Sequence, residues 1–213
     1  MKKLLSLFLI GALSFTAVAQ DEVDQSEKAK KILDEISAES KTYKSLSVDF
    51  KLVVKGGEIN SSQEGTAKVK GGKYFYETED RKVYSDGVKV WTYLTEENEC
   101  YIDLLEDLDG GINPSEILNI WEDNFKFQYS KEISATVHEI KLFPKDTKNS
   151  KYHTVIVTVD TKLKRITKAI IKTKENVLIL FTVKSLTPNV AIGDEVFKWN
   201  PAKFKGVEEI ENF

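Results

Sequence analysis

The strongest constraint in the sequence is a two-residue alternation of apolar and polar side chains, which recurs in short segments along most of the chain. It is clearest over residues 46–54, where Leu46, Phe50 and Val54 belong to the apolar set, and it stops at Gly56-Gly57. Because successive side chains of a strand point to opposite faces, this pattern predicts a half-buried strand. Ten further strands are predicted at about 59–70, 73–79, 81–85, 88–94, 99–104, 125–131, 136–143, 152–160, 164–174 and 177–186.

Short turns separate these strands. Gly71-Gly72, Glu79-Asp80 and Ser85-Asp86-Gly87 each leave room for only a few connecting residues. Strands joined so tightly are antiparallel neighbours, because a parallel crossover needs a dozen or more residues. About eleven strands in one sheet seldom stay flat, since strand twist curls them. We therefore predict an incomplete antiparallel barrel.

Two amphipathic helices are predicted besides the strands. The first covers about 26–40, with Ser26 as a possible N-cap, and the second covers 113–123 and begins at Asn113-Pro114. Their apolar residues, at helical spacing, are Ala29, Ile32, Leu33 and Ile36 in the first and Ile117, Leu118, Ile120 and Trp121 in the second. We expect both helices to cover the concave side of the sheet. The fold class is then α+β and mostly β, a half-barrel with a helical lid over a hydrophobic cavity.

The first residues have the pattern of a secretory signal peptide. Lys2 and Lys3 precede an apolar run over residues 4–15, and Ala17-Val18-Ala19 follows as a cleavage-type triplet. The run is shorter than the roughly 20 residues that span a bilayer, so a retained anchor is the weaker alternative. We expect cleavage after Ala19, a single domain over residues 20–213, and a soluble periplasmic protein.

Composition and motifs exclude most catalytic chemistry. The formal net charge is -3 and no basic patch is interleaved with aromatics, so nucleic-acid binding is not expected. Cys100 is the only cysteine, and His138 and His153 are the only histidines, all three in predicted strands. No phosphate loop, dinucleotide fingerprint or metal-ligand spacing occurs, and the acidic run 106–111 lacks the calcium pattern of an EF-hand. We predict no enzyme activity, cofactor or metal, with an envelope hydrolase as a distant alternative.

A binding role is the hypothesis that remains. A curled sheet of this many strands encloses more space than its own side chains fill. Aromatic residues are concentrated in the first half of the chain beside aliphatic strands. An apolar ligand would fit such a cavity.

An ordered series of short motifs runs through the chain. They are Tyr43-x-x-Leu46-x-Val48-x-Phe50, Gln63-Glu64-Gly65, Val69-Lys70, Phe75, Ser85-Asp86-Gly87, Trp91-x-Tyr93, Asn113-Pro114, Phe143-Pro144-Lys145 and Phe197 through Phe204. In this order they resemble the LolA-type periplasmic lipoprotein carriers. The resemblance implies an eleven-stranded incomplete barrel, a cavity for acyl chains, and transport of acylated lipoproteins from the inner to the outer membrane.

The resemblance also implies partners and candidate contacts. The partners are acylated lipoproteins, an inner-membrane lipoprotein-releasing transporter and an outer-membrane acceptor, and the expected state is a monomer. The residues expected to contact acyl chains are Phe50, Leu52, Phe75, Trp91 and Tyr93 on the sheet and Ile32, Leu33, Ile36, Ile117, Leu118 and Trp121 on the lid.

One position departs from the family pattern. Carriers of this kind commonly place an arginine and a proline where this chain has Gly71 and Gly72, and the arginine ties the sheet to the lid. Lys70 and Lys73 are the nearest cations, but lysine lacks the planar fork of arginine. Two alternatives therefore stay open, namely a sensor or scaffold for envelope lipoprotein stress and a carrier of another lipid.

Overall fold

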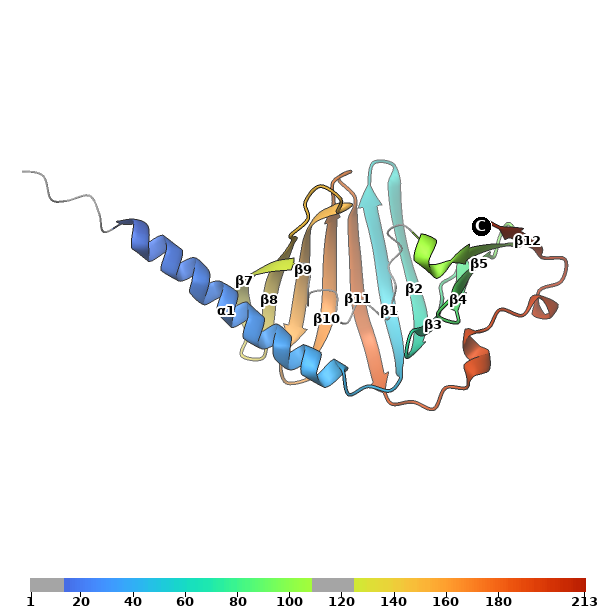
Figure 1. Cartoon of the computed structure of the whole chain (residues 1–213), viewed down its shortest axis with the longest axis horizontal. Helices are drawn as coiled ribbons and strands as arrows, with labels where there is room; N and C mark the ends of the chain where they lie inside the picture. The colour runs from blue at the N-terminus through green and yellow to red at the C-terminus, as the bar shows by residue number, and fades with distance from the viewer. Residues whose placement is uncertain (1–13, 109–124) are drawn as a thin grey trace, which may run out of the picture.

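The computed structural model describes residues 14–108 and 125–213, with side chains from residue 25 onward, and they form one twelve-stranded sheet and one α-helix (Figure 1). The helix is α1, Ser14–Ser40. The strands are β1 (Leu46–Gly56), β2 (Ile59–Lys70), β3 (Lys73–Glu77), β4 (Arg81–Ser85), β5 (Lys89–Leu94), β6 (Glu99–Leu104), β7 (Phe125–Ser134), β8 (Val137–Pro144), β9 (Tyr152–Asp160), β10 (Arg165–Thr173), β11 (Leu178–Pro188) and β12 (Glu208–Glu211). The eleven predicted strands are all present, within three residues of their expected ends.

The sheet consists of two antiparallel meanders joined at its centre. Strands β1 to β6 are neighbours in sequence order, as are β7 to β11, and β1 pairs with β11 to connect the two sets. The short strand β12 adds to β6 in parallel. Strands β7 and β12 are the two edges, so the sheet does not close into a barrel.

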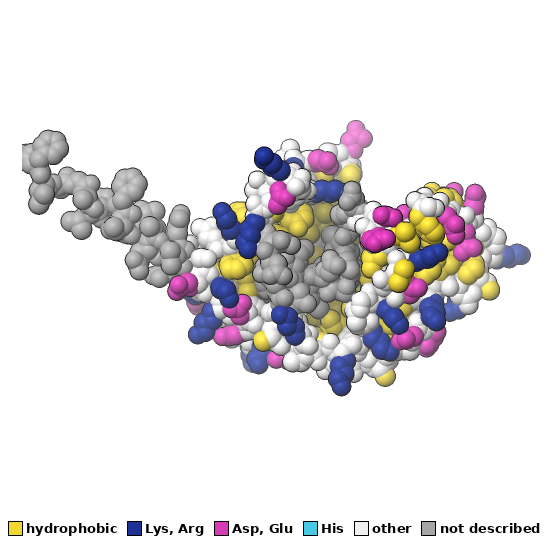
Figure 2. Space-filling view, in the orientation of Figure 1, with side chains coloured by type: hydrophobic (Ala, Val, Ile, Leu, Met, Phe, Trp, Pro, Cys, Tyr) yellow, Lys and Arg dark blue, Asp and Glu magenta, His cyan; other side chains and the backbone are white. Residues whose placement is uncertain are grey.

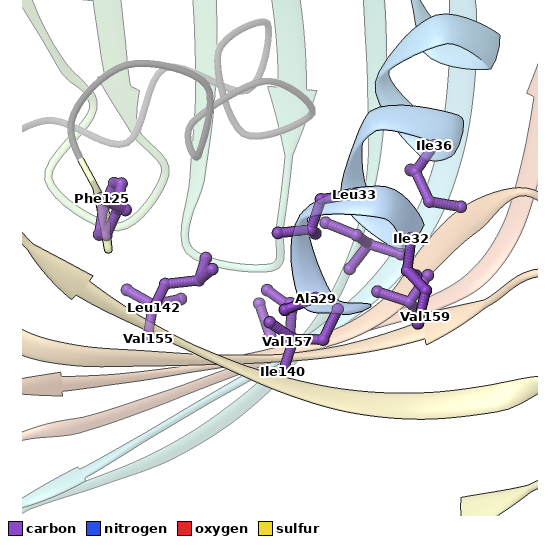
Figure 3. Close-up of a cluster of buried hydrophobic side chains, with 12 residues drawn as sticks. Ala29, Ile32, Leu33, Ile36, Phe125, Ile140, Leu142, Val155, Val157 and Val159 are labelled. Carbon is purple, nitrogen blue, oxygen red and sulfur yellow. The ribbon is translucent and has the colours of Figure 1, made fainter. Parts of the chain in front are cut away.

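Helix α1 lies across β7 to β10 on one face of the sheet (Figure 1). Its apolar residues point down onto the strands, as Figure 3 shows for Leu33 above Ile140 and Val157. Leu33 is 1% exposed, and Ile140 and Val157 are at most 2% exposed. The predicted helical stripe is therefore confirmed as the side of α1 that forms the main core.

The start of α1 differs from the prediction. The helix begins at Ser14 instead of near residue 26, so Ser26 lies within it and is not a cap. No glycine or proline occurs between Ser14 and Ser26, so nothing in the sequence ends the helix there. The predicted helix 113–123 and most of the predicted signal peptide lie outside the described residues. None of the described helices has the length and hydropathy to cross a membrane.

A second core lies on the same face as α1, beyond β1. Leu46, Val69, Tyr74, Val83 and Val90 come from five successive strands and are all at most 9% exposed. Partly buried residues before β1 and after β6 pack against them. Each end of this face thus has its own cover.

The chain after β11 forms a strap on the opposite face of the sheet, which the sequence did not predict. We call residues 189–207 the strap. Phe197 is fully buried, and Trp199 and Phe204 pack over β5 and β6. The strap leads to β12 at the edge of the sheet (Figure 1).

The helix–sheet core yields a stability prediction. Replacing Leu33 with alanine removes a buried side chain and leaves a cavity, so the free energy of unfolding should fall by about 2–5 kcal/mol. The matched control is Leu163→Ala, because Leu163 is 49% exposed, and it should change stability by less than about 0.5 kcal/mol. Urea denaturation followed by circular dichroism measures both. Equal effects would show that α1 does not anchor the fold.

Candidate functional site

The middle of the α1 side of the sheet carries a continuous apolar surface. Strand register aligns alternate residues of β1, β10 and β11, so their side chains project to the same face. We call this surface the floor, and its residues are Phe50, Leu52, Val54, Ile171, Ile179 and Phe181. It lies between the core under α1 and the second core. Figure 2 looks onto this side, where hydrophobic side chains are visible around the middle and basic and acidic side chains are mixed along the lower rim.

The floor is less buried than the two cores beside it. Leu52, Val54 and Ile179 are only partly buried, although each lies in the middle of a twelve-stranded sheet. Under α1, by contrast, Ile140, Val157 and Val159 are at most 2% exposed, whereas Phe50 is the one floor residue that is buried. The floor is therefore an apolar surface that the described residues leave partly accessible.

One aromatic stack and one glycine shape the floor. The rings of Phe50 and Phe181 stack with centroids 5.1 Å apart. Gly65 lies beside Phe50 on β2, and a Cβ there would come 2.6 Å from Phe50 Cζ and 2.4 Å from the Glu77 carbonyl oxygen. Both distances are below van der Waals contact, so only glycine fits. Close packing thus explains why the Gln63-Glu64-Gly65 motif ends in glycine.

The predicted contacts on the lid separate into two sets. Ile32, Leu33 and Ile36 are at most 9% exposed and pack on β7 to β10, at one end of the floor. Ile117, Leu118 and Trp121 lie outside the described residues. The helical lid is therefore not established by the described part of the chain.

The predicted contacts on the sheet fall on two different faces. Phe50 and Leu52 belong to the floor, but Phe75, Trp91 and Tyr93 point to the opposite face. The register pairs Phe75 with Lys68, whose side chain points to the face opposite the floor.

The strap packs on Trp91 and Tyr93, and Phe75 packs on Tyr84, which in turn contacts Trp199 of the strap. Tyr93 packs on Phe204 with ring centroids 4.4 Å apart, and Trp91 packs against the same cluster. Three consecutive aromatics, Tyr74-Phe75-Tyr76, hide the alternation that would have shown which of them faces α1. The structure shows that Tyr74 and Tyr76 face the α1 side of the sheet.

Lys70 and Lys73, considered above as substitutes for the missing arginine, bind the strap. Both ammonium groups lie 2.9 Å from the carboxylate of Asp194, and Lys70 also donates to the Ile192 carbonyl oxygen at 2.9 Å. These two hydrogen bonds, from Lys73 and Lys70, lower the pKa of Asp194 to about 2. The two lysines therefore hold the strap on the face opposite the floor.

The side chains that could take part in a reaction are either buried or hydrogen-bonded to another residue. Burial, and secondarily the charge of Glu209, raise the pKa of the Cys100 thiol to about 12. Nδ1 of His138 and the Tyr129 hydroxyl are hydrogen-bonded at 3.0 Å. Among residues 25–108 and 125–213, no three His, Cys, Asp or Glu side chains are placed to hold a metal ion.

Arg165 is a polar residue that the sequence analysis missed. Its Nη1 donates to the Leu186 carbonyl oxygen at 3.3 Å, across the gap where β10 and β11 separate. Its Nε is buried and has no hydrogen-bond partner within the described part of the chain. No motif surrounds Arg165, so no sequence signal identified it.

Two surface hollows lie outside the middle of the floor, and one of them shares Phe50 with it. One, of about 530 Å³, is lined by polar residues of β1, β2, β3 and β11 with only Phe50 as an apolar wall. The other, of about 420 Å³, follows the charged outer side of α1. Charged and polar linings do not suit an acyl chain, so we place the candidate ligand surface on the floor.

The chain matches a known protein family over most of its length. The sequence profile of the family described as outer membrane lipoprotein carrier protein LolA matches residues 19–176, which run from α1 to the turn after β10. Strand β11 and the strap follow the matched region. No protein of curated function matches the sequence.

Two solved structures share this fold at low identity, and a third aligns with a lower TM-score. An uncharacterized conserved protein from Thermus thermophilus aligns with TM-score 0.57 and 10% identity, over 87% of this chain and 99% of that one. A DUF1329 family protein from Desulfovibrio piger aligns with TM-score 0.50 and 11% identity, over 85% and 99%. A LolA superfamily protein from Nitrosomonas europaea aligns with TM-score 0.44 and 12% identity, over 80% and 97%.

Gly65 provides a test of the floor's packing. Gly65→Ala should push the Phe50 ring or β3 aside and lower the free energy of unfolding by about 1–3 kcal/mol. The matched control is Gly72→Ala, since a Cβ at Gly72 meets nothing within 4 Å, and its effect should stay within about 0.5 kcal/mol. Urea denaturation compares the two. A neutral Gly65→Ala variant would contradict the close packing of Phe50.

The Cys100 thiol should be inert in the folded protein. With a pKa of about 12, its thiolate fraction at pH 8 is more than about a thousandfold below that of an unfolded cysteine. Alkylation with iodoacetamide, followed by mass spectrometry, measures the rate. A Cys100→Ser, Ser62→Cys variant, with an exposed thiol, is the fast-reacting control. Equal rates for the two proteins would mean that the strap opens readily.

Proposed function

The chain belongs to the outer membrane lipoprotein carrier protein LolA family, and we propose that it is a periplasmic carrier that shields the acyl chains of lipoproteins on the floor. The observation that carries this proposal is the partly buried aliphatic and aromatic surface between two covered ends of one sheet face. Exposure of such an apolar surface to water is unfavourable in free energy. An acyl chain that covers it gains roughly 0.8 kcal/mol for each CH₂ group buried.

The proposed direction of transport is from the inner to the outer membrane. An inner-membrane transporter would release the lipoprotein to the floor, and an acceptor at the outer membrane would take it. The family supports this route, as does the residue pattern of the first 19 residues, which fits export. The protein would act by binding alone, without a catalytic step of its own.

We propose that cargo is retained without the arginine latch that the family pattern implies. Lys70 and Lys73 are engaged with Asp194 on the opposite face, and Gly71 has no side chain to offer. We propose that the covers at the two ends of the floor provide the enclosure instead. The rigid α1 core would then form a fixed wall, since its residues already pack on the strands.

The test compares two neighbouring residues of β1 that face opposite ways. Leu52→Asp places a charge on the floor, whereas Val53→Asp places the same charge on the other face. Leu52→Asp should weaken binding of a triacylated lipopeptide by about 10- to 100-fold, because a carboxylate would be buried against an acyl chain. Val53→Asp should leave it within about threefold. Native mass spectrometry or fluorescence titration in the absence of detergent measures the affinity.

Two outcomes would contradict the carrier function. If the wild-type protein binds no acylated peptide, the floor is not a site for acyl chains. If Leu52→Asp and Val53→Asp weaken binding equally, the ligand does not use the α1 side. Retention of a free lipid but not of an acylated peptide would assign the floor to another lipid.

A further inference from the structure

The face of the sheet that points away from α1 carries its own apolar row. Val53, Leu180, Ile170 and Ile156 are direct cross-strand neighbours on β1, β11, β10 and β9. With strands about 4.8 Å apart, the row extends for about 14 Å. All four side chains are partly buried, and none belongs to the hydrophobic clusters. The uncovered face of an antiparallel sheet is normally polar.

Lysines border this row on both sides. In the row toward the β10–β11 hairpin, Lys172 and Lys55 flank Leu178, which is 37% exposed. In the row on the other side, Lys168 and Lys51 lie on the same two strands, β10 and β1. Four lysines thus frame the aliphatic residues. We call these lysines and the aliphatic residues between them the lysine-framed face.

The charge of this face is only partly neutralised nearby, since Glu64 is the cross-strand neighbour of Lys51 on β2. None of the four lysines lies within 4.0 Å of an acid in the part of the chain that the structure describes. The acids next along the same rows have partners of their own, since Glu64 pairs with Lys184 and Glu139 lies 3.7 Å from Lys131. Although the net charge of the chain is negative, this surface is therefore locally positive and partly apolar.

We propose that the lysine-framed face docks the protein on an anionic phospholipid surface. Lysines are flexible point charges whose stems lie along apolar surface while the ammonium groups reach outward, which suits phosphate headgroups. Leu178 between two lysines can enter the headgroup region. Specific protein interfaces are instead enriched in tryptophan, tyrosine and arginine and depleted in lysine, and this face has none of those three residues. The chemistry therefore favours a membrane over an acidic protein.

Docking on this face leaves the floor free. The two surfaces use alternate residues of the same strands, so Leu52 and Val53 point to opposite sides. A docked protein could hold acyl chains on the floor while its lysine-framed face touches headgroups. Membrane docking therefore adds to the proposed carrier function without sharing a residue with it.

Vesicle flotation tests the proposal. Protein purified from cells in its natural form is mixed with vesicles of phosphatidylcholine alone or with about one third phosphatidylglycerol. Binding should require the anionic lipid and fall steeply between low and high salt. The first triple variant combines Lys55→Glu, Lys168→Glu and Lys172→Glu. Each lysine near an anionic surface contributes roughly fivefold to the partition coefficient, so this variant should lower it about a hundredfold. Leu178→Ser should weaken binding in both salt conditions.

A matched variant controls for net charge. Lys198→Glu, Lys203→Glu and Lys205→Glu together change the charge equally, but these exposed lysines lie on the strap. This variant should bind vesicles within about threefold of wild type. Equal losses in both triple variants, equal binding to neutral vesicles, or no vesicle binding by the wild type would overturn the proposal. So would a self-association in solution that only the first triple variant abolishes, since it would assign the face to a second copy.

The two proposals, membrane docking and binding of acylated peptide, can be tested separately with two variants. The triple variant on the lysine-framed face should bind acylated peptide normally, which also shows that it is folded. Leu52→Asp should lose the peptide and keep vesicle binding. Loss of vesicle binding in Leu52→Asp would mean that membrane contact occurs through the floor, and the docking proposal would then be abandoned.

Discussion

The antiparallel pairing of β1 with β11 is the contact on which the rest of the structure depends. It joins residues 46–55 to residues 178–188, more than a hundred positions apart in sequence, and merges two local meanders into one sheet. Each meander could form from near neighbours alone. Only this long-range pairing places Leu52 beside Phe181 and so creates the floor. It also places Val53 beside Leu180, which creates the apolar row on the other face.

A strand with two apolar faces gives the protein two distinct surfaces. Over 177–181 every residue is apolar, which is the pattern of a strand covered on both faces. In the described structure the α1 side of this segment belongs to the partly open floor, and the other side belongs to the lysine-framed face. Continuous hydrophobicity here therefore marks two partly exposed apolar surfaces on opposite faces of the sheet. It does not mark a strand buried on both sides by the described elements.

The strap explains why the sheet can be open and still bury its aromatics. Phe75, Tyr84 and Tyr93 face away from α1 and would meet water, but Trp199 and Phe204 pack over their half of the sheet. The ion pairs of Asp194 with Lys70 and Lys73 lie at the start of this strap and are solvent-exposed. Exposed pairs of this kind contribute little free energy. The aromatic packing is therefore the main attachment, and the lysines set where the strap crosses β2 and β3.

The sequence by itself determined the secondary structure and one part of the site. Period-two alternation and glycine turns placed all eleven expected strands, and helical spacing identified the side of α1 that packs on the sheet. Alternation within β1 also put Phe50 and Leu52 on one face. These features depend on near neighbours in the chain, which is why local pattern suffices to predict them. The tertiary structure alone decided that Phe75, Trp91 and Tyr93 face the strap, that Lys70 and Lys73 bind Asp194, and that Arg165 spans the gap between β10 and β11. Which face a strand turns toward α1 depends on its register with strands distant in sequence, and no local pattern carries that information.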